Sequence, residues 1–175
     1  MQSNGELIRL LGEINPKHPY GTEVFNALAR LTVSVAIEAV CLRFCVNQIS
    51  LRPYFMYDVD VYLTLRAPHE EYAGQWHCPG SFKRPGEQDN DVLYRLMQEE
   101  FSLNFLSQKF VGKFDNPSEK RGHIISLIYL CEMEEKGAGK GKWFPVNKLP
   151  ENTVLHHQNR IIPVAVGYFL ANLLP

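Results

Sequence analysis

The sequence lacks long uncharged apolar runs, blocks of like charge and low-complexity stretches. Its most apolar segment, Leu31 to Val46, contains Glu38 and Arg43, whereas a transmembrane helix needs roughly 20 uncharged apolar residues. The first residues are polar and do not show the basic and then apolar pattern of a signal peptide. We therefore expect a protein that does not span a membrane and is located in the cytoplasm.

Charge of one sign is not in excess either. The formal net charge is -1, and lysine and arginine are not gathered into a basic tract. Nucleic-acid-binding domains usually carry a strongly basic face, so we expect no strong nucleic-acid footprint. The length of 175 residues suits one domain.

The few cysteines do not form a metal or disulfide pattern. Cys41 and Cys45 have a spacing typical of metal ligands, but residues four apart on a strand lie far from each other. No second cysteine pair and no nearby histidine completes a zinc site. We interpret the cysteines as buried, reduced thiols.

What the sequence does contain is a series of strand-like segments that come in pairs. Period-two alternation in Tyr57 to Leu65 predicts a half-buried strand, because its valines and leucines all face one way. Further strands are expected over Thr32–Val46, Phe105–Phe114 and His123–Glu132, with a short extended segment over Trp76–Phe82.

Helices are fewer, and they are expected over Leu7–Leu11, Asp89–Phe101 and Asn159–Leu173. Asp89 or Asn90 is the expected cap of the second helix, and Pro163 lies in the first turn of the third. Loops are expected over Lys17–Thr22, Asn47–Pro53 and Lys83–Gln88. This order predicts an α/β fold of the mixed α+β kind, with a mixed sheet between helices, and not a doubly wound parallel sheet.

The segment from Pro79 to Leu103 carries the candidate chemistry. A strand end leads into a glycine-containing loop, and the helix that follows ends in the adjacent carboxylates Glu99 and Glu100. Hard cations such as Mg²⁺ bind carboxylate and phosphate oxygens together, and backbone N–H groups of such a loop can approach an anion. Lys83 and Arg84 are candidate substrate-binding cations for a phosphate, and the alternative is that both are solvated surface residues.

This segment resembles the box of the Nudix hydrolase family, which reads G-x5-E-x7-R-E-U-x-E-E-x-G-U, with U a bulky apolar residue. When the glutamate pair is placed on Glu99 and Glu100, the matching positions are Glu87, Arg95, Met97 and Leu103. The departing positions are Ser81, Leu96 and Ser102, which replace a glycine, a glutamate and a glycine. Downstream, Trp143-Phe144-Pro145 and the last helix are also similar to the family. The resemblance divides the chain into an N-terminal extension (1–30) and a Nudix-like domain (31–175).

The resemblance implies roles for these residues. Glu99 and Glu100 are expected to be catalytic and to hold Mg²⁺ or Mn²⁺, and Glu87 and Arg95 to form an ion pair that braces the loop. The family often takes one more ligand or base from a later loop. Glu134 is the choice here, and the alternatives are Glu132, Glu135 or none of them.

Other residues near the box allow a functional and a structural interpretation. His156 and His157 are expected to be loop or capping residues and not ligands. Aromatic residues near the loop either stack on a nucleobase or pack in the fold, and these are Tyr72, Trp76, Phe82, Trp143 and Phe144.

Leu96 is the departure with the largest chemical consequence. In an α-helix, residues 96 and 100 lie on one face, so an apolar side chain is expected beside Glu100 where the family has a second carboxylate. Leu96 also extends the apolar stripe of Val92, Leu93 and Met97. We therefore expect an impaired or altered metal site.

Two functions follow from the resemblance. One is a Nudix-type pyrophosphohydrolase that acts on a nucleoside diphosphate linked to another moiety. The alternative is a catalytically inactive nucleotide-binding or regulatory module on the same scaffold. The expected partner is in both cases a nucleotide-type small molecule, and a homodimer is compatible with the resemblance. A third function, a protein-interaction domain, has no positive support in the sequence.

Overall fold

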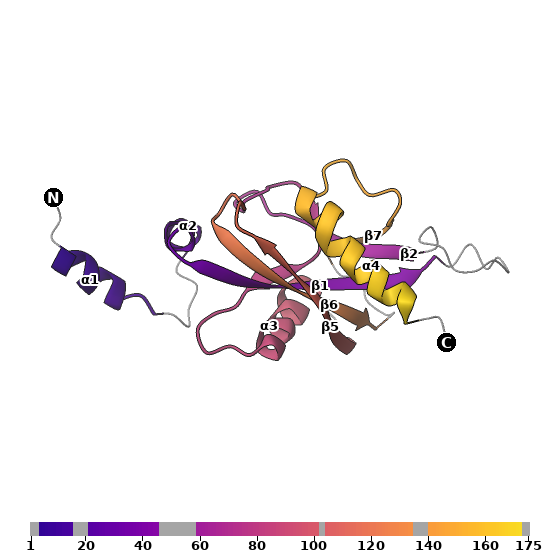
Figure 1. Ribbon diagram of the computed structural model, residues 1–175, viewed down its shortest axis with the longest axis horizontal. Coiled ribbons are helices and arrows are strands. Elements are labelled where there is room, and N and C mark those ends of the chain that lie inside the picture. The colour runs from indigo at the N-terminus through magenta and orange to yellow at the C-terminus, as the bar shows by residue number, and fades with distance from the viewer. Residues whose placement is uncertain (1–3, 16–20, 46–58, 102–103, 135–139, 173–175) are drawn as a thin grey trace.

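The computed structural model describes residues 4–15, 21–45, 59–101, 104–134 and 140–172, without the side chain of Thr22. Within these residues, one sheet has the strand order β3-β2-β1-β6-β5, and β4 and β7 pair with β1 and β2 (Figure 1). The strands are β1 (Val33–Phe44), β2 (Val59–Leu65), β3 (Trp76–His77), β4 (Gly80–Phe82), β5 (Phe105–Asn116), β6 (His123–Met133) and β7 (Lys142–Pro145). β1 and β6 are parallel and the other pairs are antiparallel, so the predicted mixed sheet is confirmed.

Helices lie on both faces of this sheet. They are α1 (Asn4–Gly12), α2 (Thr22–Ala29), α3 (Asp89–Leu96) with a π-helical turn η2 (Met97–Phe101), and α4 (Ile162–Ala171), which follows the π-helical turn η3 (His157–Ile161). Figure 1 shows α3 on one face of the sheet and α4 on the other. No helix in the described ranges combines the length and the apolar character that crossing a membrane requires.

The sheet is buried on both faces, which corrects one prediction. One apolar cluster joins Ile37 of β1 to α3, and another joins Val40 of β1 to α4. β2 lies between the same two layers. Its residues are buried from Val59 to Thr64, and only Leu65, at its end, is 51% exposed. The strand is therefore not half-buried, because a helix covers each face of the sheet.

One edge of β1 is shared by two partners. β1 pairs with β2 at Leu42–Phe44 and with β4 at Ala36–Glu38. β2 therefore leaves β1 beyond the pair Leu42↔Val61 and continues with β3.

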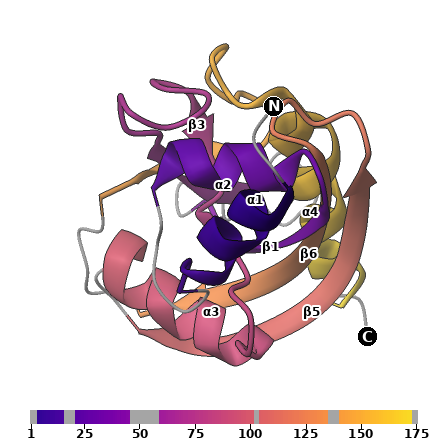
Figure 2. The same ribbon diagram turned by 90° about the vertical axis from the view of Figure 1, so that its left-hand side faces the viewer.

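The N-terminal part contains two helices, of which the sequence predicted only the first. This helix, α1, was predicted as Leu7–Leu11, has no buried residue and lies apart from the sheet (Figure 1). α2 was not predicted, and its first residue, Thr22, falls in the predicted loop. α2 lies across the end of the sheet that faces the viewer in Figure 2, and its Phe25 packs on Phe82 with ring centroids 4.5 Å apart.

Two helix boundaries differ from their predictions. Gln88 caps α3, not Asp89 or Asn90, because Gln88 is extended and forms a capping box with Asp91, whose Oδ2 accepts from the Gln88 backbone N–H at 2.7 Å. The last helix begins at His157 instead of Asn159. The predicted turn at Asn47–Pro53 lies outside the described residues, as do Ser102, Leu103 and Glu135.

Candidate functional site

The loop between β4 and α3 is braced from the helix by Arg95. Its Nε and Nη2 donate to the Glu87 carboxylate at 3.2 and 3.0 Å. Its remaining donors reach the Phe82 carbonyl at 3.1 Å and the Ser81 hydroxyl at 2.6 Å. The predicted contact between Glu87 and Arg95 is therefore present, and Ser81, which replaces a box glycine, adds a further hydrogen bond.

Glu87 also accepts a hydrogen bond from the backbone at the start of this loop. Its Oε2 accepts from the backbone N–H of Arg84 at 2.7 Å. Partial burial opposes ionisation of Glu87, but the hydrogen bonds from Arg95 and Arg84 outweigh it, and the pKa of Glu87 is lowered. Glu87 is therefore an ionised anchor for the loop.

The candidate substrate cations on the loop differ in their surroundings. Lys83 Nζ lies 2.5 Å from Asp89 Oδ1, and the same carboxylate accepts from Tyr129 at 2.5 Å. Lys83 is thus neutralised by the first turn of α3. Arg84 lines a surface depression together with Glu87 and Asp91, whose carboxylates give this depression a mixed charge.

Leu96 is the last residue of α3, and Glu100 lies in the π-helical turn η2 that follows it. η2 is a π-helical turn, in which the backbone hydrogen bonds span five residues and the turn is wider. Leu96 is 1% exposed and packs with Ile37 and Leu93 in the core on the α3 side. Glu100 is half-buried outside that cluster.

The two carboxylates of the box have different environments. Burial and the nearby Glu70 carboxyl raise the pKa of Glu100, and Lys140 and Arg66 act against this shift. Glu99 is exposed, and its backbone carbonyl accepts from Lys140 Nζ at 2.6 Å. Glu100 therefore faces a charged cluster at the sheet, whereas Glu99 faces solvent.

Glu134 lies at the end of β6, where its backbone N–H donates to the Asn104 carbonyl at 3.4 Å. Within the described ranges, no group of three or more acidic, histidine or cysteine side chains gathers in a way that would hold a metal ion. The structure thus does not bring Glu99, Glu100 and Glu134 together as one ligand set.

Arg66 is the functional candidate that the sequence did not reveal. It follows β2, and its side chain is 13% exposed. Its Nη1 lies 3.8 Å from Glu70 Oε2, and its Nε is buried without a hydrogen-bond partner among the described residues. Burial and the neighbouring Arg121 lower the pKa of Arg66, while Glu70, Glu38 and Glu100 raise it. A buried guanidinium with unused donors is a binding group for an anion.

A network of polar side chains holds the wall beside Arg66. Glu119 accepts from Arg121 Nε and from the Tyr72 hydroxyl, each at 3.0 Å. Tyr72 has a positive φ of 63°, which is uncommon for a residue with a side chain. The loop between β2 and β3 is in this way joined to the turn between β5 and β6.

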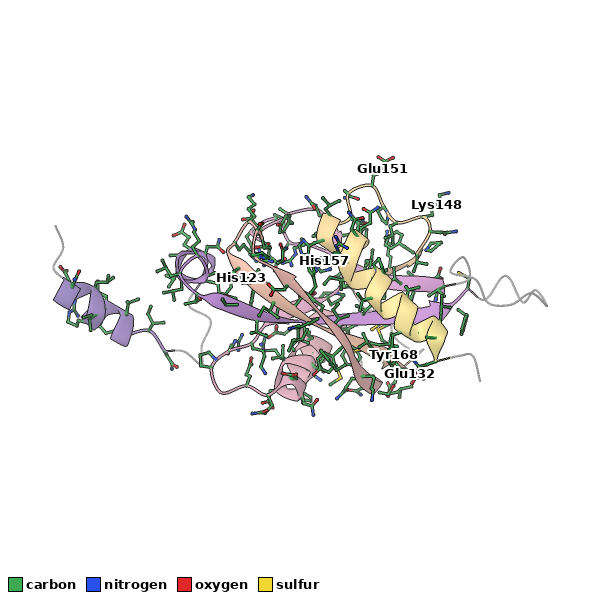
Figure 3. The ribbon with its side chains drawn as sticks, viewed as in Figure 1. His123, Glu132, Lys148, Glu151, His157 and Tyr168 are labelled. Atoms are coloured by element: carbon green, nitrogen blue, oxygen red, sulfur yellow. The ribbon has the colours of Figure 1, made fainter. Side chains whose placement is uncertain are left out.

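His157 is a structural residue of this wall and not an exposed loop residue. It is buried, and its Nδ1 accepts from the Cys78 backbone N–H at 3.2 Å, so its side chain links η3 to the segment between β3 and β4 (Figure 3). His156 packs against Tyr72 and Phe114, with ring centroids 6.0 and 6.4 Å apart.

The aromatic residues near the box also favour the structural interpretation. Trp76 packs edge-on against Phe144 at 4.8 Å, and Trp143 packs against Tyr62 at 5.5 Å. With Phe25 on Phe82, these rings contact each other inside the fold.

Comparison with solved protein structures identifies the fold of this chain. The chain is 20% identical in sequence to a mutT/nudix family protein from Listeria innocua, and the two structures superpose with a TM-score of 0.59. The match covers 81% of this chain and 98% of the Listeria protein. The chain has the Nudix fold. The Nudix domain of Shewanella oneidensis NrtR, solved with ADP ribose, is 18% identical, with a TM-score of 0.57 and coverage of 93% and 97%. The Nudix resemblance predicted from the box is confirmed.

Two further comparisons bear on this Nudix-fold protein. It is 25% identical over 103 residues, or 55% of its length, to the ADP-ribose pyrophosphatase of Methanocaldococcus jannaschii, and spans 61% of that protein. It spans 62% of the longer NrtR chain, with a TM-score of 0.58. No family model matches the sequence.

Proposed function

We propose that this Nudix-fold protein binds a nucleoside diphosphate linked to a second group, of the ADP-ribose class, beside Arg66 and Glu100. The observation that carries the proposal is the buried guanidinium of Arg66, whose Nε has no partner among the described residues. A diphosphate supplies oxygens that accept from such donors. The pyrophosphatase of Methanocaldococcus jannaschii and the NrtR domain solved with ADP ribose support this ligand class.

The residues of this chain divide the binding between them. Arg66 neutralises the diphosphate, and the pair of Glu87 and Arg95 fixes the loop whose N–H groups approach the anion. The ion pair of Glu119 and Arg121 holds the wall beside Arg66. Little rearrangement is then needed on binding, which favours affinity.

Glu99 and Glu100 fit one weakly held Mg²⁺ or Mn²⁺. Burial and the acidic neighbours Glu70 and Glu99 raise the pKa of Glu100, and a divalent cation would relieve this repulsion. Leu96 supplies no oxygen, and Glu134 is not gathered with the pair. A metal bound there would polarise the diphosphate and activate a water.

Hydrolysis of the bound diphosphate is the second candidate function, and the retained Glu87–Arg95 brace and Glu99–Glu100 pair favour it. Binding without turnover is favoured by Leu96, which is part of the core and not of the site. We conclude that binding is the function that the geometry supports best.

Calorimetric titration of ADP-ribose tests binding. Arg66→Ala is expected to weaken affinity by about tenfold or more, because the variant loses a charge-assisted contact. The matched control is Arg160→Ala, an exposed arginine on η3, which should bind like wild type. Equal affinity in wild type and Arg66→Ala, or no binding by wild type, would contradict the proposal.

Turnover is tested separately with ADP-ribose, nucleotide sugars, dinucleoside polyphosphates and nucleoside triphosphates, each with Mg²⁺ or Mn²⁺. Activity above that of Glu100→Gln would establish hydrolysis. A rate that equals this variant's for every substrate would leave binding alone. Gain of activity in Leu96→Glu would identify the missing carboxylate as the cause.

Two predicted properties concern larger partners. The predicted absence of a strong nucleic-acid footprint is open to direct test, since NrtR was solved with a 27mer DNA and this chain spans 61% of that protein. A DNA-binding titration checks this prediction. Sedimentation velocity over a range of concentrations checks for a homodimer.

A further inference from the structure

Arg121, in the turn between β5 and β6, is an arginine that Glu119 holds at one end of its guanidinium group. Glu119 Oε2 accepts from the Arg121 backbone N–H at 2.6 Å, and Glu119 Oε1 accepts from Arg121 Nε at 3.0 Å. The Glu119 side chain is 1% exposed, and that of Arg121 is 13% exposed. Because a buried ion pair is often no more stable than apolar residues of similar volume, fold stability alone does not account for this pair.

The other end of the Arg121 guanidinium is free for a ligand. Among the described residues, none forms a hydrogen bond with its Nη1 or Nη2, and neither of these atoms is buried. All but one of the five N–H donors of an arginine side chain belong to these two nitrogens, and they lie in one plane. Arg121 therefore presents to solvent the planar donor pair that binds a phosphate through two hydrogen bonds.

One ring beside Arg121 belongs to the loop that begins with Arg66. This loop is closed at its base, where the Arg66 backbone N–H donates to the Gln75 carbonyl at 3.0 Å. Tyr72 lies within the loop, and the centre of its ring is 5.9 Å from Arg121 Cζ. The Tyr72 hydroxyl donates to Glu119 Oε1 at 3.0 Å, so the carboxylate that holds Arg121 also holds the Arg66 loop.

A second ring beside Arg121 belongs to the strand that leads into the box loop. Arg121 Cζ lies over the Phe82 ring, 5.0 Å from its centre. The Phe82 carbonyl accepts from Arg95, the residue that braces the box loop, at 3.1 Å. A contact with a ring uses the face of the guanidinium and not the N–H donors in its plane. Arg121 thus contacts both segments to which the proposed function assigns anion binding, and its terminal donors stay available.

We propose that Arg121 is a second contact for the diphosphate, and that Glu119 is the positioning residue that directs its terminal nitrogens to the ligand. The inference rests on the proposed function, since it needs a diphosphate beside Arg66. A ligand of the ADP-ribose class carries a negative charge on each phosphate, and a pair of guanidinium groups matches this charge. Glu119 is buried and its oxygens are used by Arg121 and Tyr72, so it acts through Arg121 and not on the ligand.

Arg121→Lys separates contact with the ligand from the structural role of the side chain. Lysine keeps a positive charge that can pair with Glu119, but it lacks the planar pair of terminal donors. In calorimetric titration of the full chain with ADP-ribose in EDTA, the affinity should fall by about tenfold, because charge-assisted hydrogen bonds are lost. The melting temperature of the free protein should stay close to that of wild type. The matched control is Arg160→Lys, at an exposed position on η3, which should bind like wild type.

Glu119→Gln gives a second signature, in which the sign of the effect distinguishes two roles. If Glu119 acted only through its charge, its neutralisation would remove a repulsion, and the anionic ligand would bind more tightly. If Glu119 holds Arg121 in place, the variant frees the guanidinium to adopt other orientations, and binding weakens. We expect the affinity for ADP-ribose to fall several-fold. Glu151→Gln, on an exposed loop (Figure 3), makes the same chemical change away from the site and should bind like wild type.

The outcomes separate the inference from the proposed function. If wild type binds and Arg66→Ala weakens binding, but Arg121→Lys binds like wild type, the inference is overturned and the proposed function stands. Unchanged or tighter binding by Glu119→Gln overturns the positioning role, and this variant decides the matter if Arg121→Lys does not fold. Absence of binding by wild type overturns both.

Discussion

At the scale of single residues, the site depends on a close approach between Gly80 and Glu38. The carboxyl of Glu38 occupies the space that a side chain at position 80 would need. Glu38 is in turn held by Ser126 and enclosed by apolar neighbours, so it has little room to move. The backbone that leads into the box loop is therefore fitted to a buried carboxyl.

Gly80→Ala is expected to destabilise the fold by about 1–3 kcal/mol, because the added methyl group meets Glu38 Oε2 and the Ile37 carbonyl. Urea unfolding measures the change. Gly167→Ala makes the same chemical change on α4 where nothing lies within 4 Å, and should be neutral or slightly stabilising. Equal effects of the two substitutions would show that the contact with Glu38 is unimportant.

Glu38 also makes stability depend on pH. Its folded-state pKa, about 7, is raised above the reference value of 4.5, so its contribution to stability is present below about 4.5 and is lost as the pH rises through about 7. Relative to Glu38→Gln, the wild-type free energy of unfolding should fall by about 3 kcal/mol over that window. Unfolding curves at several pH values measure it, and parallel curves for the two proteins would refute it.

At the scale of elements, the box loop, α3 and η2 act as one unit. Arg95 links three parts of the loop to the helix through Ser81, Phe82 and Glu87. Leu96, at the end of α3, packs in the core, and Glu100 lies half-buried in the π-helical turn that follows. The brace is thus intact, whereas among the described residues no three acidic, histidine or cysteine side chains gather to hold a metal ion.

Arg95→Ala should lower the free energy of unfolding by about 2–3 kcal/mol, since it leaves Glu87 without its charged partner. Urea unfolding at neutral pH measures the loss. Arg9→Ala removes an arginine from the exposed pair with Glu13 on α1 and should change stability by no more than about 0.5 kcal/mol. A loss as small in Arg95→Ala would mean that the brace does not stabilise the fold.

At the scale of the whole molecule, the sheet topology assembles the candidate site. Glu38 comes from β1, Arg66 from the end of β2, and Glu100 from the turn after α3. β2 and β4 share one edge of β1, so the segment after β2 and the strand that leads into the box loop belong to the same sheet. The N-terminal helices differ in their attachment, since α2 packs on Phe82 and α1 lies apart (Figures 1 and 2).

Removal of residues 1–12 should leave the melting temperature nearly unchanged, because α1 buries none of its residues. Removal of residues 1–30 should lower it, since Ala29 is buried and Phe25 packs on Phe82. Thermal unfolding of both truncated proteins checks this. Equal melting temperatures would show that α2 does not stabilise the domain.

The sequence by itself determined the elements and the loop brace. Period-two alternation and apolar runs are local patterns, so they located the strands, the helix after the box and the last helix. The pair of Glu87 and Arg95 was also visible, because both residues lie within the box spacing. The same local patterns failed for α2 and for the π-helical turn η2, which depend on what they pack against.

Only the tertiary structure decided the full burial of β2 and the burial of the Arg66 side chain. Each depends on contacts between residues far apart in the chain, and the periodicity of a segment does not encode its neighbours. In the sequence alone, Arg66 is an arginine that follows a predicted strand, with no motif around it that indicates a function. It becomes a binding candidate because the fold buries its side chain next to Glu70 and leaves its Nε without a partner among the described residues.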